Sequence, residues 1–464
     1  MARTLHCWLN GRWDSRAPPD LARSYMAMPD TTAVSAAARP GLGRRRDVDM
    51  ARAVAQFAVV VFHVPQYFHR YHVDTMNASF VDWVMSACSS MHIPTFMLMA
   101  GFAAGMSRET VVDLASYIRF AGRKFCRLML PFLSVSLLTL VIKTTLLGGT
   151  AGRLTFWQGC MATVDSVLVP RSGIAGHLWF LHCLMLIFLI WPLLQRSIPS
   201  RRTSMLLVVL AAASLIPIRW PVDGEGWSWF GLADVVTYLP IFALGFWYRR
   251  DAADGWRPRV GHLAAAAAVF IAVLCILVTR PWPSLDGGMP KRVLTLVAFT
   301  SGALMVFWGC GLLDRHAERP AAVLARIGFY SYDIYLLHVI MVGHPLSLLV
   351  GRLRPGVPSV YFWFAAVVLA TMLIPMVIGR MIRRFPRLAF IVLGLPGREA
   401  VGLPGKEGVG ELGGRPEPDS VLSLPGGAFD WQSVLGRAVR SNWLSTGFAW
   451  RRRRVRQVDR RGST

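Results

Sequence analysis

The sequence predicts an all-α protein, a polytopic transmembrane helix bundle of about ten helices. Three observations support this fold class. Hydrophobic residues make up 54% of the 464 residues and charged residues only 16%. The apolar residues gather in runs of about 20, the length that crosses the apolar core of a bilayer as a helix. Short basic loops separate these runs, and the strand-like alternation of polar and apolar residues is rare.

We expect the apolar runs to cross the membrane one after another along the chain. They lie at 50–68, 80–106, 128–147, 177–195, 203–218, 232–248, 262–279, 293–313, 328–350 and 360–379. Because this number of spans is even, both termini are predicted to lie on the same side of the membrane.

Lys and Arg are unequally divided between alternate loops. The loops on the side of the termini hold 23 of them, and the loops on the opposite side hold 9. Cytoplasmic loops carry such an excess, so we expect a cell-membrane protein with both termini in the cytoplasm. The net charge of +24 then reflects topology and contact with anionic membrane lipids. No binding motif accompanies the charge, so nucleic acid is not an expected partner.

Two tails flank the predicted bundle, which occupies residues 46–395. Residues 1–45 lack a continuous apolar segment, so we expect no cleaved signal but a disordered or misassigned start. Residues 396–464 begin Gly- and Pro-rich and include the basic run 451–454, which predicts a disordered tail. The seven cysteines are scattered, without a CxxC pair or a His/Cys cluster, so neither a metal site nor a disulfide framework is expected.

The first predicted helix contains the main chemical signal, in the segment DVDMARAVAQFAVVVFHVPQYF. Arg52, Gln56 and His63 are separated by offsets of 4 and 11, which place all three on one helix face. The helical rise puts His63 about 16 Å from Arg52, deep in the membrane. An ionisable group at that depth usually faces a cavity or the bundle interior. A histidine there serves either chemistry or hydrogen bonding between helices, and the residue by itself does not decide between them.

The ninth predicted helix offers a partner for that histidine. Ser331, Tyr335 and His338 in GFYSYDIYLLHVIMV fall on one face. In the predicted topology His338 reaches a depth similar to that of His63, so the two histidines could line one cavity. A histidine such as His338, taken alone, more often serves helix packing than function.

A basic run precedes the third predicted span, in FAGRKFCRLMLP. Arg123, Lys124 and Arg127 gather there before Pro131. They either anchor the helix at the cytoplasmic surface or bind the phosphates of a cytoplasmic cofactor, for which the bidentate arginine fork is suited. The fourth span opens GHLWFLHCLMLIF, which places His177 and Trp179 at the outer interface.

Four blocks of the chain, in order, resemble those of the family-3 membrane acyltransferases, in the branch with short loops. They are DMARAVAQFAVVVFH with Arg52 and His63, MHIPTFMLMAGFAAG, the basic run followed by HLWFLHCL, and SYDIYLLH. Ala100 stands where a serine is usual in the second block. The closing MIRRFPRLAFIVLG is similar to shorter members, whereas an acidic residue near the end of the last helix of larger members has no match.

The resemblance implies transfer of an acyl group, with acetyl as our expectation, from cytoplasmic acyl-CoA to a hydroxyl of a sugar, glycan or lipid-linked saccharide. The family histidine maps onto His63 and the family arginine onto Arg52. The basic run with Arg123, Lys124 and Arg127 maps onto the loop that faces the cofactor. No metal is implied.

The chemistry of the residues agrees with this resemblance. Attack on a thioester needs a base for the hydroxyl, and histidine is the usual base near neutral pH, so His63 is the predicted general base. Tyr335 and His338 are candidates for hydrogen bonds to the oxyanion. We identify no Cys or Ser that is paired with a base as a nucleophile, which favours direct transfer over an acyl-enzyme. The alternative is a transporter or flippase of a small polar or lipid-linked substrate, although no internal repeat supports it.

Overall fold

The structure is a computed structural model that describes residues 45–70, 76–107, 111–145, 156–171, 173, 175–197, 203–216, 229–251, 258–280, 288–341, 345–353, 355–356 and 359–395. The chain divides into two compact units, Met1–Leu403 and Pro404–Thr464, and all described residues belong to the first. The predicted tails at 1–45 and 396–464 lie outside the described residues, apart from Arg45.

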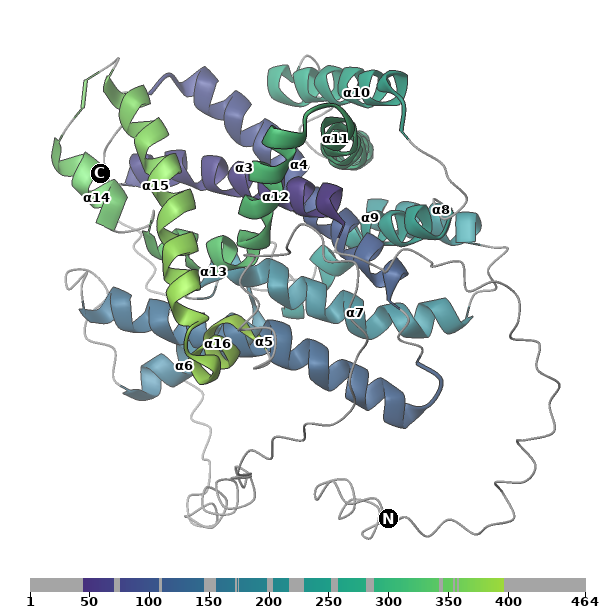
Figure 1. The fold of residues 1–464 in the computed structure, drawn as a ribbon, viewed down its shortest axis with the longest axis horizontal. Coiled ribbons are helices and arrows are strands. Elements are labelled where there is room, and N and C mark those ends of the chain that lie inside the picture. Colours follow the sequence, from purple (N-terminus) through teal and green to yellow (C-terminus); the bar gives the residue numbers. More distant parts are fainter. Residues whose placement is uncertain are drawn as a thin grey trace, which may run out of the picture. The chain divides into compact units, whose positions relative to one another are not determined.

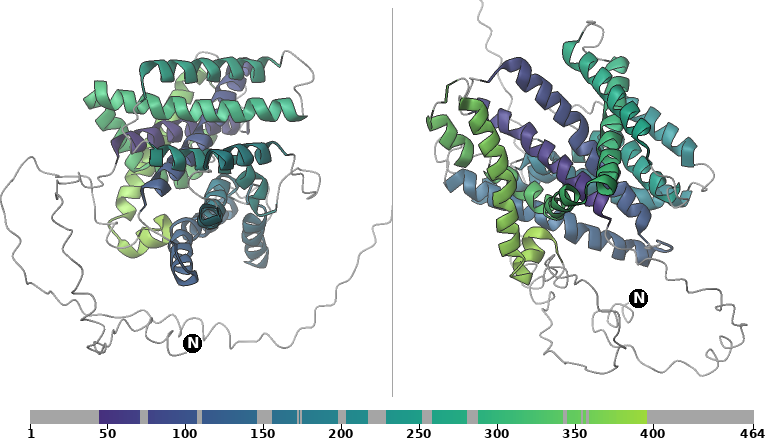
Figure 2. Two further views of the ribbon diagram at one scale, coloured as in Figure 1. Left: turned by 90° about the vertical axis from the view of Figure 1, so that its right-hand side faces the viewer. Right: turned by 45° about the horizontal axis from the view of Figure 1, so that its top comes forward.

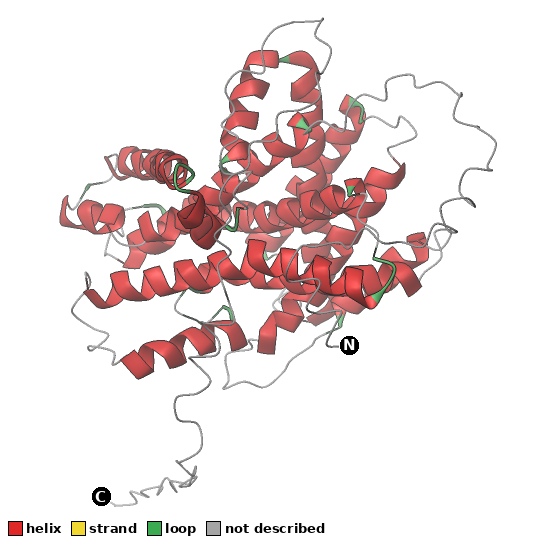
Figure 3. Ribbon diagram, turned by 60° about the horizontal axis from the view of Figure 1, so that its bottom comes forward, coloured by secondary structure: helices red, strands yellow, loops and turns green. Residues whose placement is uncertain are grey.

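Every regular element in the described part of the chain is a helix (Figure 3). The helices are α3 (Arg46–Arg70), α4 (Ala78–Met106), α5 (Leu114–Thr145), α6 (Phe156–Leu168), η2 (Gly176–Leu178), α7 (Trp179–Ser197), α8 (Thr203–Leu215), η4 (Trp229–Gly231), α9 (Leu232–Asp251), α10 (Val260–Thr279), α11 (Gly288–His316), α12 (Glu318–Phe329), α13 (Ser331–Met341), α14 (Ser347–Leu353), α15 (Ser359–Ile382) and α16 (Pro386–Leu393). The predicted all-α fold class is therefore confirmed.

Fewer helices of the described chain are long and apolar enough to cross a membrane than the ten predicted. Among the described residues, seven helices are long and apolar enough to cross a membrane, and the bent pair α12 and α13 makes up to eight. Each of the ten predicted segments is at least partly helical, but α8 has only 13 residues, about 20 Å of helix, which is less than a bilayer core. Helix α9 has 20 residues but includes Asp234, Arg249 and Asp251.

The predicted continuous span at 328–350 is wrong. Helix α12 ends at Phe329 and α13 begins at Ser331, with a bend of 65° between them. At the break the amide of Tyr330 donates to the carbonyl of Ile327, a tighter turn than that of an α-helix. Helix α13 then contacts α3, α5 and α15 (Figure 1). The break therefore directs the SYDIYLLH segment into the bundle.

Glycines allow the close approach of α4 and α9. A Cβ on Gly101 of α4 would overlap the carbonyl of Phe242, and a Cβ on Gly245 of α9 would overlap the carbonyl of Leu98. Inside a bilayer the hydrophobic effect does not drive helices together. Small residues at such crossings let the backbones approach closely, so that van der Waals packing stabilises the contact. Helices α10 and α11 lie side by side elsewhere in the bundle (Figure 2).

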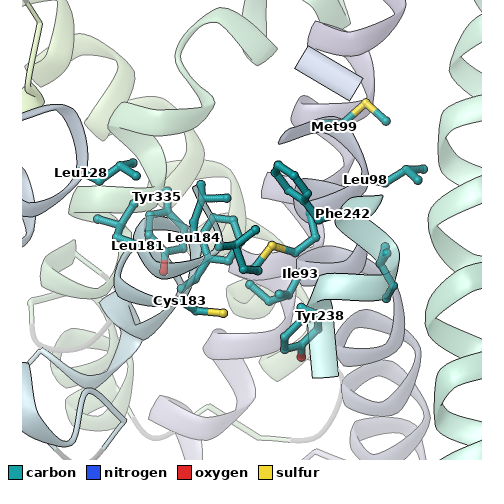
Figure 4. Packing of buried hydrophobic residues seen from close by; sticks show 14 of the residues in the cluster. Ile93, Leu98, Met99, Leu128, Leu181, Cys183, Leu184, Tyr238, Phe242 and Tyr335 are labelled. Carbon is teal, nitrogen blue, oxygen red and sulfur yellow. The ribbon is translucent and has the colours of Figure 1, made fainter. Parts of the chain in front are cut away.

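The main core joins α4, α5, α7, α9 and α13. Ile93, Leu181 and Tyr238 belong to this cluster of buried residues, and Tyr335 of α13 does too (Figure 4). A second cluster, which includes Val60 and Val64, packs α3 against α13 and α15. Helix α13 thus contributes to both clusters and is held on two sides.

Candidate active site

Helix α3 is one continuous helix that contains Arg52, Gln56 and His63. Asp47 and Asp49 lie in its first turn, where carboxylates interact favourably with the helix dipole. Gly328 of α12 packs directly on the backbone of Asp49. The polar face predicted from the sequence therefore lies on one continuous helix.

The structure brings His63 and His338 together. Their ring centroids lie 5.2 Å apart, although the residues come from α3 and α13. His338 is completely buried, and His63 is partly buried. The two predicted histidines therefore share one site.

The hydrogen bonds of the two rings indicate where their protons lie. His338 Nδ1 is 2.7 Å from the carbonyl oxygen of Tyr335, which can only accept, so Nδ1 carries the proton of the neutral ring. His338 Nε2 is buried and has no hydrogen-bond partner among the described residues. His63 Nδ1 lies 3.1 Å from Oε1 of Gln66, the oxygen of a carboxamide. In that arrangement both rings keep the Nε2 lone pair for another donor.

Tyr335 connects the histidines to η2, the short helix just before α7. Its hydroxyl donates to the carbonyl oxygen of His177 at 2.6 Å. Its ring packs against Phe96 and Phe180, with centroids 6.4 and 5.6 Å away. The single hydroxyl proton is used in this bond, so in this structure Tyr335 links α13 to η2. A hydrogen bond from Tyr335 to an oxyanion stays a prediction.

His177 is a third histidine at the site, whereas the sequence predicts it only at the outer interface. Its ring stands perpendicular to that of His338, with centroids 5.6 Å apart. His92 of α4 lies beyond Phe62, whose ring is within 5.3 Å of both the His92 and the His63 ring. The sequence signal that could have placed His177 at the site is its position within the GHLW block.

Within the described ranges, no group of three or more His, Cys, Asp or Glu side chains could hold a metal ion.

Two ion pairs hold the elements around these histidines. Arg383 forms a bidentate pair with Asp333 of α13, with Nη2 at 2.8 Å from each carboxylate oxygen, and both residues are buried. Arg171 donates hydrogen bonds from Nε and Nη2 to the two carboxylate oxygens of Asp234, at 2.9 and 2.6 Å. Its guanidinium lies 3.7 Å from the centroid of a Trp179 ring. The first pair fixes α13, and the second joins the loop before α7 to α9.

The predicted cofactor-binding residues occupy a different setting. Arg123 and Arg127 of α5 are exposed, and Arg52 of α3 is partly buried with Nη1 3.4 Å from Asp49 Oδ1. Lys124 lies over the ring of Phe188, with Nζ 4.2 Å from the centroid. The hydroxyl of Tyr332 donates to the Arg127 carbonyl at 2.9 Å. The basic turn of α5 is thus attached to α13 through its backbone, while Arg123 and Arg127 lie on the surface of the bundle.

The apolar helices that are long enough to cross a membrane indicate an integral membrane protein. Residues 45–380 match acyltransferase family 3, described as an acyltransferase domain, and the chain belongs to this family. It is similar to "Acyltransferase MdmB" of Streptomyces mycarofaciens, with 24% identity over 335 residues that cover 65% of this chain and 80% of the relative. No solved structure matches the chain. The protein is therefore a membrane acyltransferase, and family membership favours an enzyme over the transporter alternative.

Proposed function

We propose that the protein transfers an acyl group, acetyl in the simplest case, from cytoplasmic acyl-CoA to a hydroxyl of a sugar, glycan or lipid-linked saccharide. The observation that carries the proposal is the contact of His63 with His338. Two neutral rings that keep lone pairs at a buried site are suited to accept protons from a hydroxyl.

His63 is the proposed general base. Its Nε2 takes the proton of the acceptor hydroxyl while the hydroxyl oxygen attacks the thioester carbonyl carbon. The tetrahedral intermediate collapses, the carbon–sulfur bond breaks, and the acyl group stays on the acceptor oxygen. The leaving thiolate takes the proton from the histidinium and departs as free CoA. His338 and Tyr335 are the candidates to stabilise the oxyanion by hydrogen bonds. In that role His338 would carry a proton on Nε2, and the Tyr335 hydroxyl would leave the His177 carbonyl.

Arg52, Arg123, Lys124 and Arg127 are the proposed residues for the CoA phosphates. A guanidinium group donates hydrogen bonds in a fork that matches phosphate geometry, and Arg123 and Arg127 are exposed. Arg52 shares a helix face with His63, about 16 Å along the axis, so one extended donor could reach both.

Production of free thiol tests the reaction. Purified protein in detergent is given acetyl-CoA with and without a panel of sugars and lipid-linked saccharides, and CoA release is followed by a thiol reagent. We expect release that depends on an acceptor and disappears in His63→Gln. Comparison of acylated glycans and lipids from cells with and without the gene identifies the acceptor. The absence of thiol release with every acyl-CoA and acceptor offered would contradict the proposal.

The proposed orientation in the cell membrane has a separate test. Both termini are placed in the cytoplasm because the basic residues favour that side, 23 to 9. A reporter that is active only outside the cell, fused after residue 395, should stay inactive, and cysteine labelling should reach the loop near 148–176 from outside. Activity of the reporter would show that the chain after residue 395 lies outside the cell, and this would contradict the proposed orientation.

A further inference from the structure

Gln56 is a completely buried side chain whose carboxamide has no hydrogen-bond partner among the described residues. Neither its Nε2 nor its Oε1 is paired. Such a group is unusual because burial without a partner sacrifices the hydrogen bonds that water supplied in the unfolded chain. A buried hydroxyl such as that of Thr371 can turn toward a carbonyl of its own helix, whereas the carboxamide of a helical glutamine needs a partner from elsewhere.

The position of Gln56 indicates which partner this is. It lies on α3 one turn after Arg52 and two turns before His63, on the same helix face. The rise along the axis is about 6 Å from Arg52 and about 10 Å to His63. Under the proposed function, Arg52 contacts the phosphates of the donor and His63 acts beside its thioester. The chain that joins phosphates to thioester is the pantetheine arm, which carries two amide groups.

We infer that Gln56 binds the pantetheine arm of the acyl-CoA donor by pairing its carboxamide with an amide of that arm. An amide presents one N–H donor and one carbonyl acceptor, the complement of the two unpaired atoms of Gln56. This assignment rests on the proposed function, since it requires an acyl-CoA donor that runs along α3. It explains why a polar side chain is placed on a buried helix face between the two predicted functional residues.

Two probes separate the arm from the nucleotide. We would measure, by calorimetry in detergent, the Kd of CoA and of adenosine 3′-phosphate 5′-diphosphate, which has the phosphates but no pantetheine. Gln56→Leu should weaken CoA binding about tenfold, as expected for an amide left unpaired in the complex, and should leave nucleotide binding unchanged. Arg52→Ala should weaken the binding of both probes.

The controls distinguish binding from folding. Thr371→Val removes another completely buried, unpaired polar group, from α15, and should change neither Kd. Gln56→Leu without ligand should melt at or above the wild-type temperature, because an apolar side chain replaces an unpaired amide. Gln56→Met, which fills a similar unbranched shape, replaces the leucine variant if that one does not fold.

The outcomes separate the two proposals. Equal CoA binding by wild type and by both Gln56 variants would overturn the role of Gln56 and leave the proposed function intact. Equal weakening of CoA and nucleotide would also overturn it, because the lost contact would not involve the arm. A clear loss of stability in both variants, with unchanged CoA binding, would assign Gln56 to a structural water instead. A wild-type protein that does not bind CoA would overturn the proposed donor and this assignment with it.

Discussion

The histidine site and the basic turn of α5 hold predicted functional residues in opposite physical settings. His63 and His338 come from distant parts of the chain, and their rings are in contact within the bundle. Arg123 and Arg127 are neighbours in the sequence, and both are exposed. The first site is built by tertiary packing, whereas the second exists already in a single helical turn.

The difference shows where preorganisation lies in this enzyme. The position of His338 depends on the bend before α13, on the hydrogen bond from its ring to the carbonyl of Tyr335, and on the buried pair of Asp333 with Arg383. A group held in this way is ready for a reaction that tolerates little error in geometry. Arg123 and Arg127 lie at the surface, where their positive charge attracts a diffusing anionic ligand.

The largest effect is expected at the histidine site. His63→Gln keeps a side chain that can form hydrogen bonds but removes the base, so turnover should fall roughly a hundredfold to ten-thousandfold. Acyl-CoA binding and thermal stability should remain near those of the wild type. Initial rates of thiol release and a binding isotherm on the same preparation measure both quantities.

His69→Gln is the matched control, because His69 is an exposed histidine near the end of the same helix. It should keep wild-type turnover. His338→Ala should be milder than His63→Gln if His338 orients the substrate. Wild-type turnover in a well-folded His63→Gln variant would move the general base to His338.

The next effect concerns the ion pair that fixes α13. Asp333→Asn leaves the guanidinium of Arg383 buried without its counter-charge, and the loss of one partner of a buried pair costs about 3–5 kcal/mol. Unfolding in detergent, followed by denaturant or temperature, measures this loss. Turnover should fall as well, because α13 carries His338.

Asp314→Asn is the control for that variant. Asp314 pairs with Arg46 at 3.3 Å, but about a third of each side chain is exposed. An exposed pair contributes about 0–1 kcal/mol, so the change in stability should be small. Equal losses of stability in the two variants would show that the burial of the pair of Asp333 with Arg383 does not raise its contribution to stability.

A smaller effect is expected at the arginines. Arg52→Ala, Arg123→Ala and Arg127→Ala should each weaken acyl-CoA binding by about 1–3 kcal/mol, the usual range for a charge-assisted hydrogen bond. The turnover of the saturated enzyme should change less than in His63→Gln. Arg384→Ala, an exposed arginine outside the α5 turn, serves as the control. Normal binding by all three folded variants would reduce the arginines to a topology signal.

The smallest effect is expected at Lys124. Its ammonium lies over the rings of Phe188 and Phe120, at 4.2 and 5.3 Å, so part of its interaction is already made within the protein. Lys124→Met should weaken acyl-CoA binding less than either neighbouring arginine variant. A loss equal to that of Arg127→Ala would show that Lys124 leaves the rings to bind the donor.

The sequence by itself determined the class of fold and the local chemistry. Apolar runs of membrane length predict helices because the backbone must satisfy its own hydrogen bonds in lipid. The shared face of Arg52, Gln56 and His63 follows from helical periodicity and needs no tertiary information. The basic turn of α5 and the four blocks of the family are likewise local, and the family match confirms the resemblance that they suggested.

Only the tertiary structure decided which local features meet. The approach of His338 to His63, and of His177 to His338, depends on a helix break and on helix crossings at glycines, neither of which has a period in the sequence. The pairing of Asp333 with Arg383 was also visible only in the tertiary structure. So was the burial of the Gln56 carboxamide without a hydrogen-bond partner among the described residues. Helix faces are set within a few residues, whereas contacts between helices are set by how whole elements pack.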